Sequence, residues 1–176
     1  MLQLVVNLFG APAMNDLLAL QRYEPRFTID FLVSLALPVG EYNSDQALNL
    51  GQNRWYGRVG APMMYSFGPW VPGERTTIEL LPAVWLFGDN DNFQGQTLSS
   101  DPMFQVEAHL TRDLTPSAWA SFDVAWFSGS DSTIGGIEQV GNDNLGIGLT
   151  FGYQVNDNLL ITVGYFSTIN DSDPGD

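Results

Sequence analysis

The sequence contains no cysteine and no lysine. Without cysteine, disulfide bonds, thiolate catalysis and cysteine-ligated zinc are excluded. The 6 basic residues are all arginines, and 20 acidic residues bring the net charge to -14. Nucleic acid is therefore excluded as a partner, because phosphate binding needs a basic surface.

Long hydrophobic runs are also absent. A membrane-spanning helix needs roughly 18 to 20 consecutive apolar residues, and the best candidate, residues 31–39, is interrupted by Pro38. A helical membrane protein is therefore excluded. Residues 1–10 lack the positive region of a signal peptide, and Gln3 and Asn7 interrupt their apolar run. We expect either an intracellular chain or a leader that lies upstream of this sequence.

Charge of either sign is scarce, whereas aromatic residues and glycine are plentiful. Charged residues make up 15% of the chain, against about 25% in a typical soluble domain, while aromatics reach 12% and glycine numbers 18. This balance is unusual for a surface that faces water on all sides. The length of 176 residues predicts a single domain, residues 1–176.

Apolar residues alternate with polar or small ones along most of the chain. In residues 27–38, for example, every odd position is apolar, from Phe27 to Leu37, while the even positions are mixed. Alternation of this kind predicts β-strands with one apolar face. About eight strands are expected on this basis, at residues 2–9, 27–38, 54–67, 76–88, 103–113, 119–127, 145–153 and 159–168.

The lengths of the strands and of their connections favour a membrane barrel. Several runs are about 9 to 13 residues long, which is close to the length of a tilted strand that crosses a bilayer. Short connections at 68–74, 114–118 and 155–158 alternate with long acidic ones, at 39–53, 89–102 and 128–143. Short turns on one side and long loops on the other are typical of outer-membrane barrels.

Aromatic residues lie near the predicted strand ends, as expected for rings at the level of the lipid headgroups. The outer set is Trp55, Phe87, Phe104, Trp126 and Phe127, and the inner set is Phe67, Trp119 and Tyr153. A soluble β-sandwich or lipocalin-like barrel would also show alternation and core aromatics. The polar face, however, has too few large apolar residues to fill a dry interior. We predict an all-β fold: an antiparallel up-and-down transmembrane β-barrel.

Residues 10–25 interrupt the strand pattern. Residues 16–22 could form one or two helical turns, with Asn15 as a possible N-cap. This segment is interpreted as a structured turn or a plug-like excursion.

Charged residues on the polar face are the candidate functional residues. The candidates for lining the lumen are Asp30, Arg54, Arg58, Glu79, Glu107, His109 and Asp123. Counting along the hairpin at 114–118 places Glu107 opposite Asp123 and His109 opposite Ser121. Paired carboxylates can act as acid and base, but charges in a wet barrel interior usually control the passage of solutes. We therefore predict no enzymatic activity.

The two arginines near the outer mouth leave two interpretations open. Arg54 and Arg58 share the even side of their predicted strand, opposite the carboxylates of Glu79, Asp30 and Glu107. They could form a basic ladder whose transverse field orients solutes, or interior salt bridges that hold the barrel in shape.

No cofactor or defined metal site is predicted. His109 is the only histidine, which excludes a multi-histidine metal site. Residues 88–95 resemble a calcium loop, but Phe93 stands at a ligand position and the glycine comes one residue late. A loose divalent-cation site there stays open. Phosphate-binding glycine loops and the motifs of serine hydrolases and zinc proteases do not occur.

Several short segments resemble one known family. In order along the chain they are VNLFGAPA at 6–13, LPVGEY at 37–42, LNLGQNRW at 48–55, FGDNDNF at 87–93 and DP at 101–102. Together they are similar to the family named for the MetA pathway of phenol degradation, whose members are often labelled as transporters. The resemblance implies a Gram-negative outer-membrane β-barrel, surrounded by lipid and lipopolysaccharide, that takes up aromatic or other hydrophobic compounds. It implies no catalytic residues.

The resemblance also implies a longer barrel. Such proteins begin with a leader and further strands and commonly end in a strand with a terminal aromatic residue, whereas this sequence ends in a loop-like segment, 170–176. We therefore expect a chain truncated at both ends and an incomplete barrel with two open edges.

Two functions follow from these patterns. The first is passive uptake of small hydrophobic or aromatic solutes through an outer-membrane channel. The alternative is a structural or adhesive barrel whose acidic loops bind cations without transport. An enzyme that uses Glu107, His109 and Asp123, and a soluble lipid-binding barrel, are the less favoured possibilities. The oligomeric state is left open.

Overall fold

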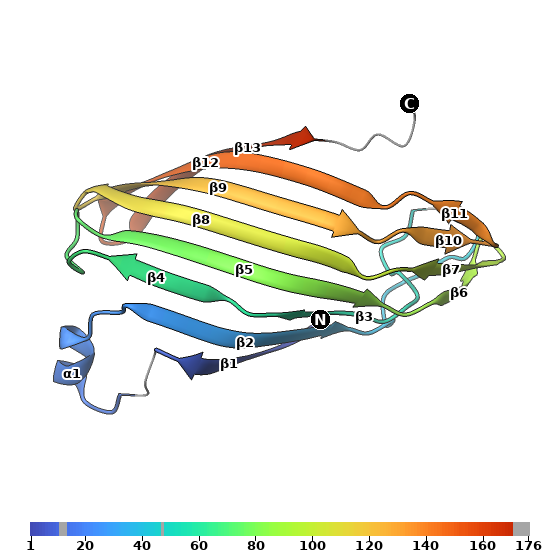
Figure 1. Cartoon of the computed structure of the whole chain (residues 1–176), viewed down its shortest axis with the longest axis horizontal. Helices are drawn as coiled ribbons and strands as arrows, with labels where there is room; N and C mark the ends of the chain where they lie inside the picture. The colour runs from blue at the N-terminus through green and yellow to red at the C-terminus, as the bar shows by residue number, and fades with distance from the viewer. Residues whose placement is uncertain (11–13, 47, 171–176) are drawn as a thin grey trace.

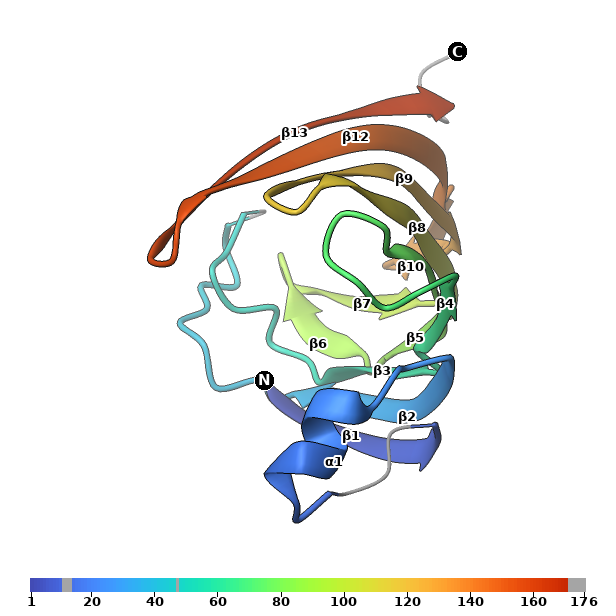
Figure 2. The ribbon, with the colours of Figure 1, turned by 90° about the vertical axis from the view of Figure 1, so that its left-hand side faces the viewer.

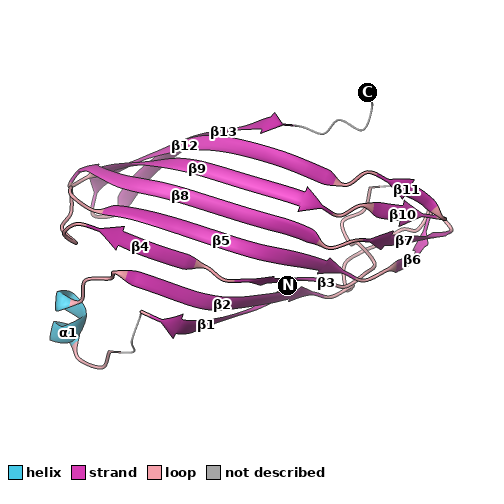
Figure 3. Cartoon of the chain, in the orientation of Figure 1, coloured by secondary structure: helices cyan, strands magenta, loops and turns pink. Residues whose placement is uncertain are grey.

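A computed structural model describes residues 1–10, 14–46 and 48–170 (Figure 1). Most of this part of the chain is β-strand, and its one helix, α1 (Leu17–Arg22), is short. The strands are β1 (Leu2–Phe9), β2 (Phe27–Ala36), β3 (Tyr56–Gly60), β4 (Met63–Phe67), β5 (Thr76–Phe87), β6 (Asn90–Phe93), β7 (Gln96–Ser100), β8 (Met103–Thr115), β9 (Ala118–Gly129), β10 (Ser132–Ile134), β11 (Ile137–Gln139), β12 (Asn142–Asn156) and β13 (Leu159–Asn170). Figure 3 shows how completely strands dominate.

The long strands form one antiparallel sheet in chain order. Its path runs β1-β2-β3-β5-β8-β9-β12-β13, and β4 continues the line of β3 between β2 and β5. Each strand pairs with its sequence neighbour, which is the up-and-down arrangement predicted for the eight runs. The sheet curves strongly, so that the view along the strands shows an open trough (Figure 2). Among the described residues β1 pairs only with β2, and β13 only with β12.

The run predicted at residues 54–67 is two strands rather than one. β3 ends at Gly60 and β4 begins at Met63, with Pro62 between them. Proline has no backbone N–H to donate to a ladder, so a bulge or break is expected there. The carbonyl of Pro62 still accepts a 2.8 Å hydrogen bond from the N–H of Asp30, which keeps the break aligned with β2.

A second, smaller sheet lies at one end of the strands. Two of the segments predicted as loops, 89–102 and 128–143, contain hairpins that pair in the order β11-β10-β7-β6. These strands are short and polar, so alternation does not mark them. Positive φ angles at Gln94 (52°) and Gly95 (75°) form the tight turn of the β6–β7 hairpin. In Figure 2, which looks along the strands from the opposite end, this hairpin projects across the opening.

The main sheet has an apolar convex face. The register aligns exposed side chains strand by strand as Phe27, Tyr65, Ile78, Leu110, Phe122, Leu149 and Tyr165. The buried side chains are mostly polar or charged and belong to the other face. Large apolar residues are thus exposed and polar ones buried, the reverse of a water-soluble protein.

Some of the predicted girdle aromatics face the other way. Trp55, Phe104 and Trp126 are exposed on the convex side near the outer strand ends. Phe127, the neighbour of Trp126, points to the concave side, because successive side chains of a strand alternate between faces. Phe87 and Trp119 also line hollows of the concave face. The prediction was therefore wrong for three of its members.

The helix predicted at residues 16–22 is confirmed, but its cap is different. The side chain of Asp16 accepts a 3.0 Å hydrogen bond from the N–H of Leu18, so Asp16 rather than Asn15 caps α1. α1 lies beside the end of the trough that carries the short turns (Figure 1). Within the described ranges, no helix has the length and apolar character needed to span a membrane.

Candidate functional site

One row of side chains crosses the concave face near the middle of the strands. The register aligns it from β2 to β9 as Thr28, Met64, Glu79, His109 and Asp123. We call this set the charged row. Three of the predicted lumen residues thus lie next to one another on adjacent strands, which the sequence pattern alone did not specify.

The pairing within the row differs from the prediction. Glu107 was predicted to face Asp123, but Asp123 is paired with His109 and Glu107 with Ala125. β8 and β9 extend further than expected, so that residues 116–117 alone connect them. Asp113 and Trp119, which flank the predicted turn 114–118, pair with each other. Counting back from that pair gives His109 with Asp123 and Glu107 with Ala125, so the predicted partners were wrong by two residues.

Asp123 is the most constrained member of the charged row. It is only 9% exposed. One carboxylate oxygen lies 2.7 Å from Nδ1 of His109 and accepts a 2.6 Å hydrogen bond from the hydroxyl of Ser121. The other accepts a 2.7 Å hydrogen bond from the hydroxyl of Thr150. Four side chains on three strands therefore hold one another in place.

The same contacts argue against acid–base catalysis at this point. The hydroxyl of Ser121 donates to Asp123 and not to His109. A serine nucleophile needs the reverse arrangement, with its proton passing to an adjacent base. The arrangement is suited to positioning His109 and to presenting a polar surface.

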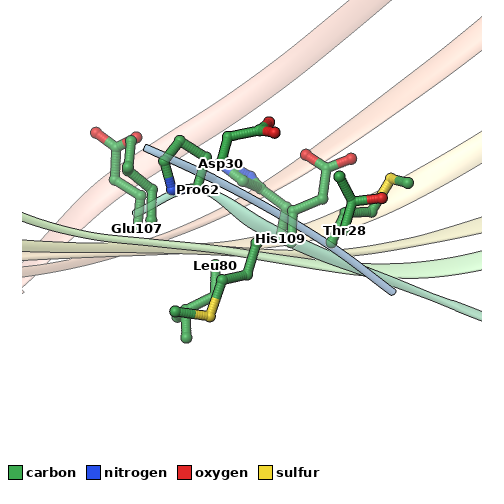
Figure 4. Close-up of a pocket in the computed structure, with 10 residues that line it drawn as sticks. Thr28, Asp30, Pro62, Leu80, Glu107 and His109 are labelled. Carbon is green, nitrogen blue, oxygen red and sulfur yellow. The ribbon is translucent and has the colours of Figure 1, made fainter. Parts of the chain in front are cut away.

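The remaining carboxylates of the concave face are less restrained. Glu107 accepts a 2.7 Å hydrogen bond from the side chain of Gln105, and Asp30 accepts one of 2.7 Å from Asn7. Glu79 has no hydrogen-bond or ion-pair partner in the described part of the chain. Figure 4 shows Asp30, Glu107 and His109 on one side of the sheet and Leu80 on the other. A hollow of about 350 Å³ lies along these carboxylates.

The two predicted arginines lie closer to the outer end. Arg58 is in β3, whereas Arg54 precedes the strand in a bend, so its predicted strand position was wrong. Each guanidinium lies over an aromatic ring of β5, Arg54 over Phe87 and Arg58 over Trp85, at 5.0 Å from the ring centre in both cases. Partial burial lowers the pKa of Arg54, and the negative charge of nearby Asp89 acts in the opposite direction.

Neither arginine forms the interior salt bridge that was one of the two open interpretations. Within residues 1–10, 14–46 and 48–170, the ion pairs are Arg75–Asp113 at 2.7 Å, Arg26–Glu24 at 3.3 Å and His109–Asp123. The transverse-field interpretation stays a prediction. The bridging role belongs to Arg75 and Asp113, near the end with the short turns. The alternating pattern of residues 103–113 could have placed Asp113 on the concave face. Its partner, Arg75, could not be found in this way, because Arg75 lies outside any strand.

A buried asparagine joins the loops at the outer end. Asn90 is 1% exposed. Its amide nitrogen donates to the hydroxyl of Tyr42 at 2.9 Å and to the carbonyl of Gln52 at 3.1 Å. Its oxygen accepts from the side chain of Asn53 at 3.0 Å and from the backbone of Asn92 at 3.1 Å. Sequence reasoning missed this role and considered the segment for calcium instead.

The described ranges contain no group of three or more histidine, cysteine, aspartate or glutamate residues able to hold a metal ion. In the segment considered for calcium, the Asn90 oxygen is already occupied by two protein donors. The geometry therefore gives the loose cation site no support.

The solved structure of an outer membrane channel from Pseudomonas putida F1 superposes with a TM-score of 0.67 at 21% sequence identity, covering 81% of this chain and 53% of that chain. The chain thus spans about half the length of that protein, and the likeness shows the fold of an outer-membrane β-barrel. The predicted fold class is confirmed.

A search of proteins with curated functions finds no significant match. The sequence profile of one family, "Putative MetA-pathway of phenol degradation", matches residues 7–175. The resemblance inferred from the short segments is confirmed. The chain belongs to this family.

Proposed function

We propose that the chain forms part of the wall of a channel in the bacterial outer membrane, through which small hydrophobic or aromatic solutes pass passively. The observation that carries the proposal is the inverted distribution of polarity. Leu149 and Tyr165 on the convex face are 64% and 74% exposed, whereas Gln105 and Asp123 on the concave face are 2% and 9% exposed. A surface of this kind is stable where hydrocarbon covers the convex side and water fills the concave side.

The concave face is built for a wet lumen. A row of hydroxyl side chains, Ser66, Thr77, Thr111, Ser121 and Thr150, runs beside the charged row on adjacent strands. Ser66, Thr77 and Ser121 are buried, whereas Thr111 and Thr150 are partly exposed. Exposed hydroxyls and carboxylates exchange hydrogen bonds with water at low cost, so solutes can move past them. Membrane lipid and lipopolysaccharide are the surroundings that this arrangement requires on the convex side.

Aromatic rings on the concave face support a hydrophobic or aromatic solute. Trp119 packs over Gly152, and Phe166 packs over Gly146 and Gly148, where a side chain would collide with the rings. These flat apolar surfaces border the same hollow as Glu79 and His109, whose volume is about 500 Å³. A ring-shaped solute can stack on them while the polar rows stay hydrated. The family description, which names phenol degradation, is in accord with this solute class.

Liposome swelling with the full-length protein tests the proposal. We expect swelling in phenyl glucoside and other small neutral solutes that cross lipid slowly by themselves, at rates proportional to the gradient and independent of any energy source. Empty liposomes and liposomes with heat-denatured protein are the controls. If no solute permeates, the channel proposal is wrong.

A structural role without transport is favoured by one observation. The β6–β7 hairpin projects across the outer opening (Figure 2), and Asn90 ties it to residues Tyr42 and Gln52. If this hairpin always covers the opening, no solute passes through the barrel. Single-channel recordings that stay silent for the intact protein, but show conductance after removal of the hairpin, favour the structural role.

A further inference from the structure

Two arginine–aromatic stacks lie side by side on the outer part of the concave face. The ring partners, Trp85 and Phe87, are alternate residues of β5 and therefore point to the same side. Arg58, in β3, is paired with Trp85 of β5 in the register. Arg54 lies just before the first residue of β3. The contacts place both guanidinium groups 5.0 Å above their rings, within the range of a cation–π interaction.

Both guanidinium groups keep hydrogen-bonding capacity that the protein does not use. Arg54 donates to the side chains of Gln52 at 3.3 Å and Ser100 at 2.8 Å, both neutral. Arg58 donates no side-chain hydrogen bond within the described ranges, and its Nε is buried without a partner. Asp89 acts on the charge of Arg54 but does not form an ion pair with it. A guanidinium offers five N–H donors, so several remain free for a ligand.

A hollow next to the Arg54–Phe87 stack has a matching size and polarity. Its volume is about 400 Å³, and its lining includes Arg54, Phe87, Leu98, Ser100, Met103 and Ser132. The apolar members can cover one face of a ring, while the hydroxyls and the guanidinium can receive a carboxylate. Arginine is the residue whose planar fork matches a carboxylate with two parallel hydrogen bonds.

We propose that Arg54 and Phe87 form a binding subsite for aromatic carboxylates at the outer mouth, and that the neighbouring Arg58–Trp85 stack supports it with a second positive charge. The inference rests on the proposed function, because it names the class of solute that the channel selects. Glu107 and Glu79 lie further along the concave face and repel the same anion. Selective binding at the mouth, rather than faster flux, is therefore the direct consequence.

Ligand binding to the full-length protein in detergent tests the subsite. Benzoate, benzyl alcohol and benzylammonium share a ring and differ in charge, and tryptophan fluorescence reports their binding because Trp85 belongs to the site. We expect saturable binding of benzoate only. Arg54→Gln should weaken it roughly tenfold or more, as expected for loss of a charged hydrogen bond, and Arg58→Gln should weaken it less, because it removes only a neighbouring charge.

Matched controls separate charge from folding. Arg26→Gln removes an arginine that pairs with Glu24 outside the subsite, and it should bind benzoate as the parent does. Arg58→Lys keeps the charge without the planar fork and should recover part of the affinity. All variants should migrate as folded barrels in unheated gels; a variant that does not is replaced by its lysine counterpart. Acetate, which lacks the ring, should bind more weakly than benzoate.

Three outcomes would overturn the inference: equal affinity for benzoate and benzyl alcohol, unchanged benzoate affinity in both glutamine variants, or equal loss in Arg26→Gln. Failure of the channel proposal is a separate result. It appears as absent swelling with phenyl glucoside, a neutral solute whose permeation does not depend on either arginine.

Discussion

Asn90 joins the loop residues Tyr42, Gln52 and Asn53 to the β6–β7 hairpin at the outer end. Its side chain uses both amide hydrogens and accepts two hydrogen bonds while it is 1% exposed. Side chains of the same region make further local contacts, such as the bonds from Asn49 to the carbonyls of Asn43 and Gln46. The short family segments at 37–42, 48–55 and 87–93 therefore meet in a cover at the outer end, to which 87–93 contributes the short strand β6.

Asn90→Ala should loosen this cover. The change leaves the partners of Asn90 without their hydrogen bonds, which should cost about 1–3 kcal/mol locally. We expect faster cleavage of residues 39–53 by a protease added outside, and a larger open probability in single-channel recordings. Asn92→Ala is the control, because the Asn92 side chain makes no hydrogen bond among the described residues. Equal cleavage of both variants contradicts the role of Asn90.

At the level of elements, β12 depends on its interior glycines. Gly146, Gly148 and Gly152 occupy the concave side of the strand, and rings from the two neighbouring strands cover them. A glycine covered by a cross-strand aromatic ring loses less stability than a bare one, because the ring shields the backbone. This packing explains why an otherwise weak strand former recurs at alternate positions.

Gly152→Ala should disturb this packing. A Cβ there would collide with Cε2 of Trp119, so the indole ring would have to move away from β12. We expect a loss of about 1–3 kcal/mol in unfolding free energy, as for other overpacked sites. Gly164→Ala on β13 is the matched control, since its nearest contact would be an ordinary 3.4 Å to Thr150. Urea titrations in detergent or lipid compare the two, and equal midpoints would show that the ring packing is unimportant.

At the scale of the whole molecule, stability depends on which solvent each face meets. Leu149 lies in the middle of β12 on the convex face, between Phe122 and Tyr165. Thr111 lies on the concave face in the hydroxyl row. The two positions are on neighbouring rows but should respond oppositely to charge.

Leu149→Arg should destabilise the protein in lipid by about 2–4 kcal/mol, the cost of arginine at the bilayer midplane of a barrel. Thr111→Arg should cost little, because its charge enters water. Folding titrations into bilayers measure both. A larger loss for Thr111→Arg would mean that the convex face is not covered by lipid.

Local rules account for what could be predicted. Alternation over long stretches located all eight main strands, because each strand has one apolar face. It did not separate β3 from β4, where Pro62 interrupts the ladder, nor did it find β6, β7, β10 and β11, which are held by backbone pairing and glycine turns. The charged residues of the concave face could be identified from their alternate positions along each strand. Their partners were not predicted correctly, because a miscount of two residues along the hairpin places every cross-strand partner wrongly.

The sequence by itself determined the class of fold and its orientation toward lipid and water, because period-two hydrophobicity is a property of neighbouring residues. The family segments likewise pointed to an outer-membrane barrel. The tertiary structure alone decided that His109 meets Asp123, that Arg54 and Arg58 lie on aromatic rings rather than on carboxylates, and that Asn90 closes the outer loops. These contacts join residues far apart in the chain, and they depend on register, turn length and sheet curvature, which no local pattern encodes.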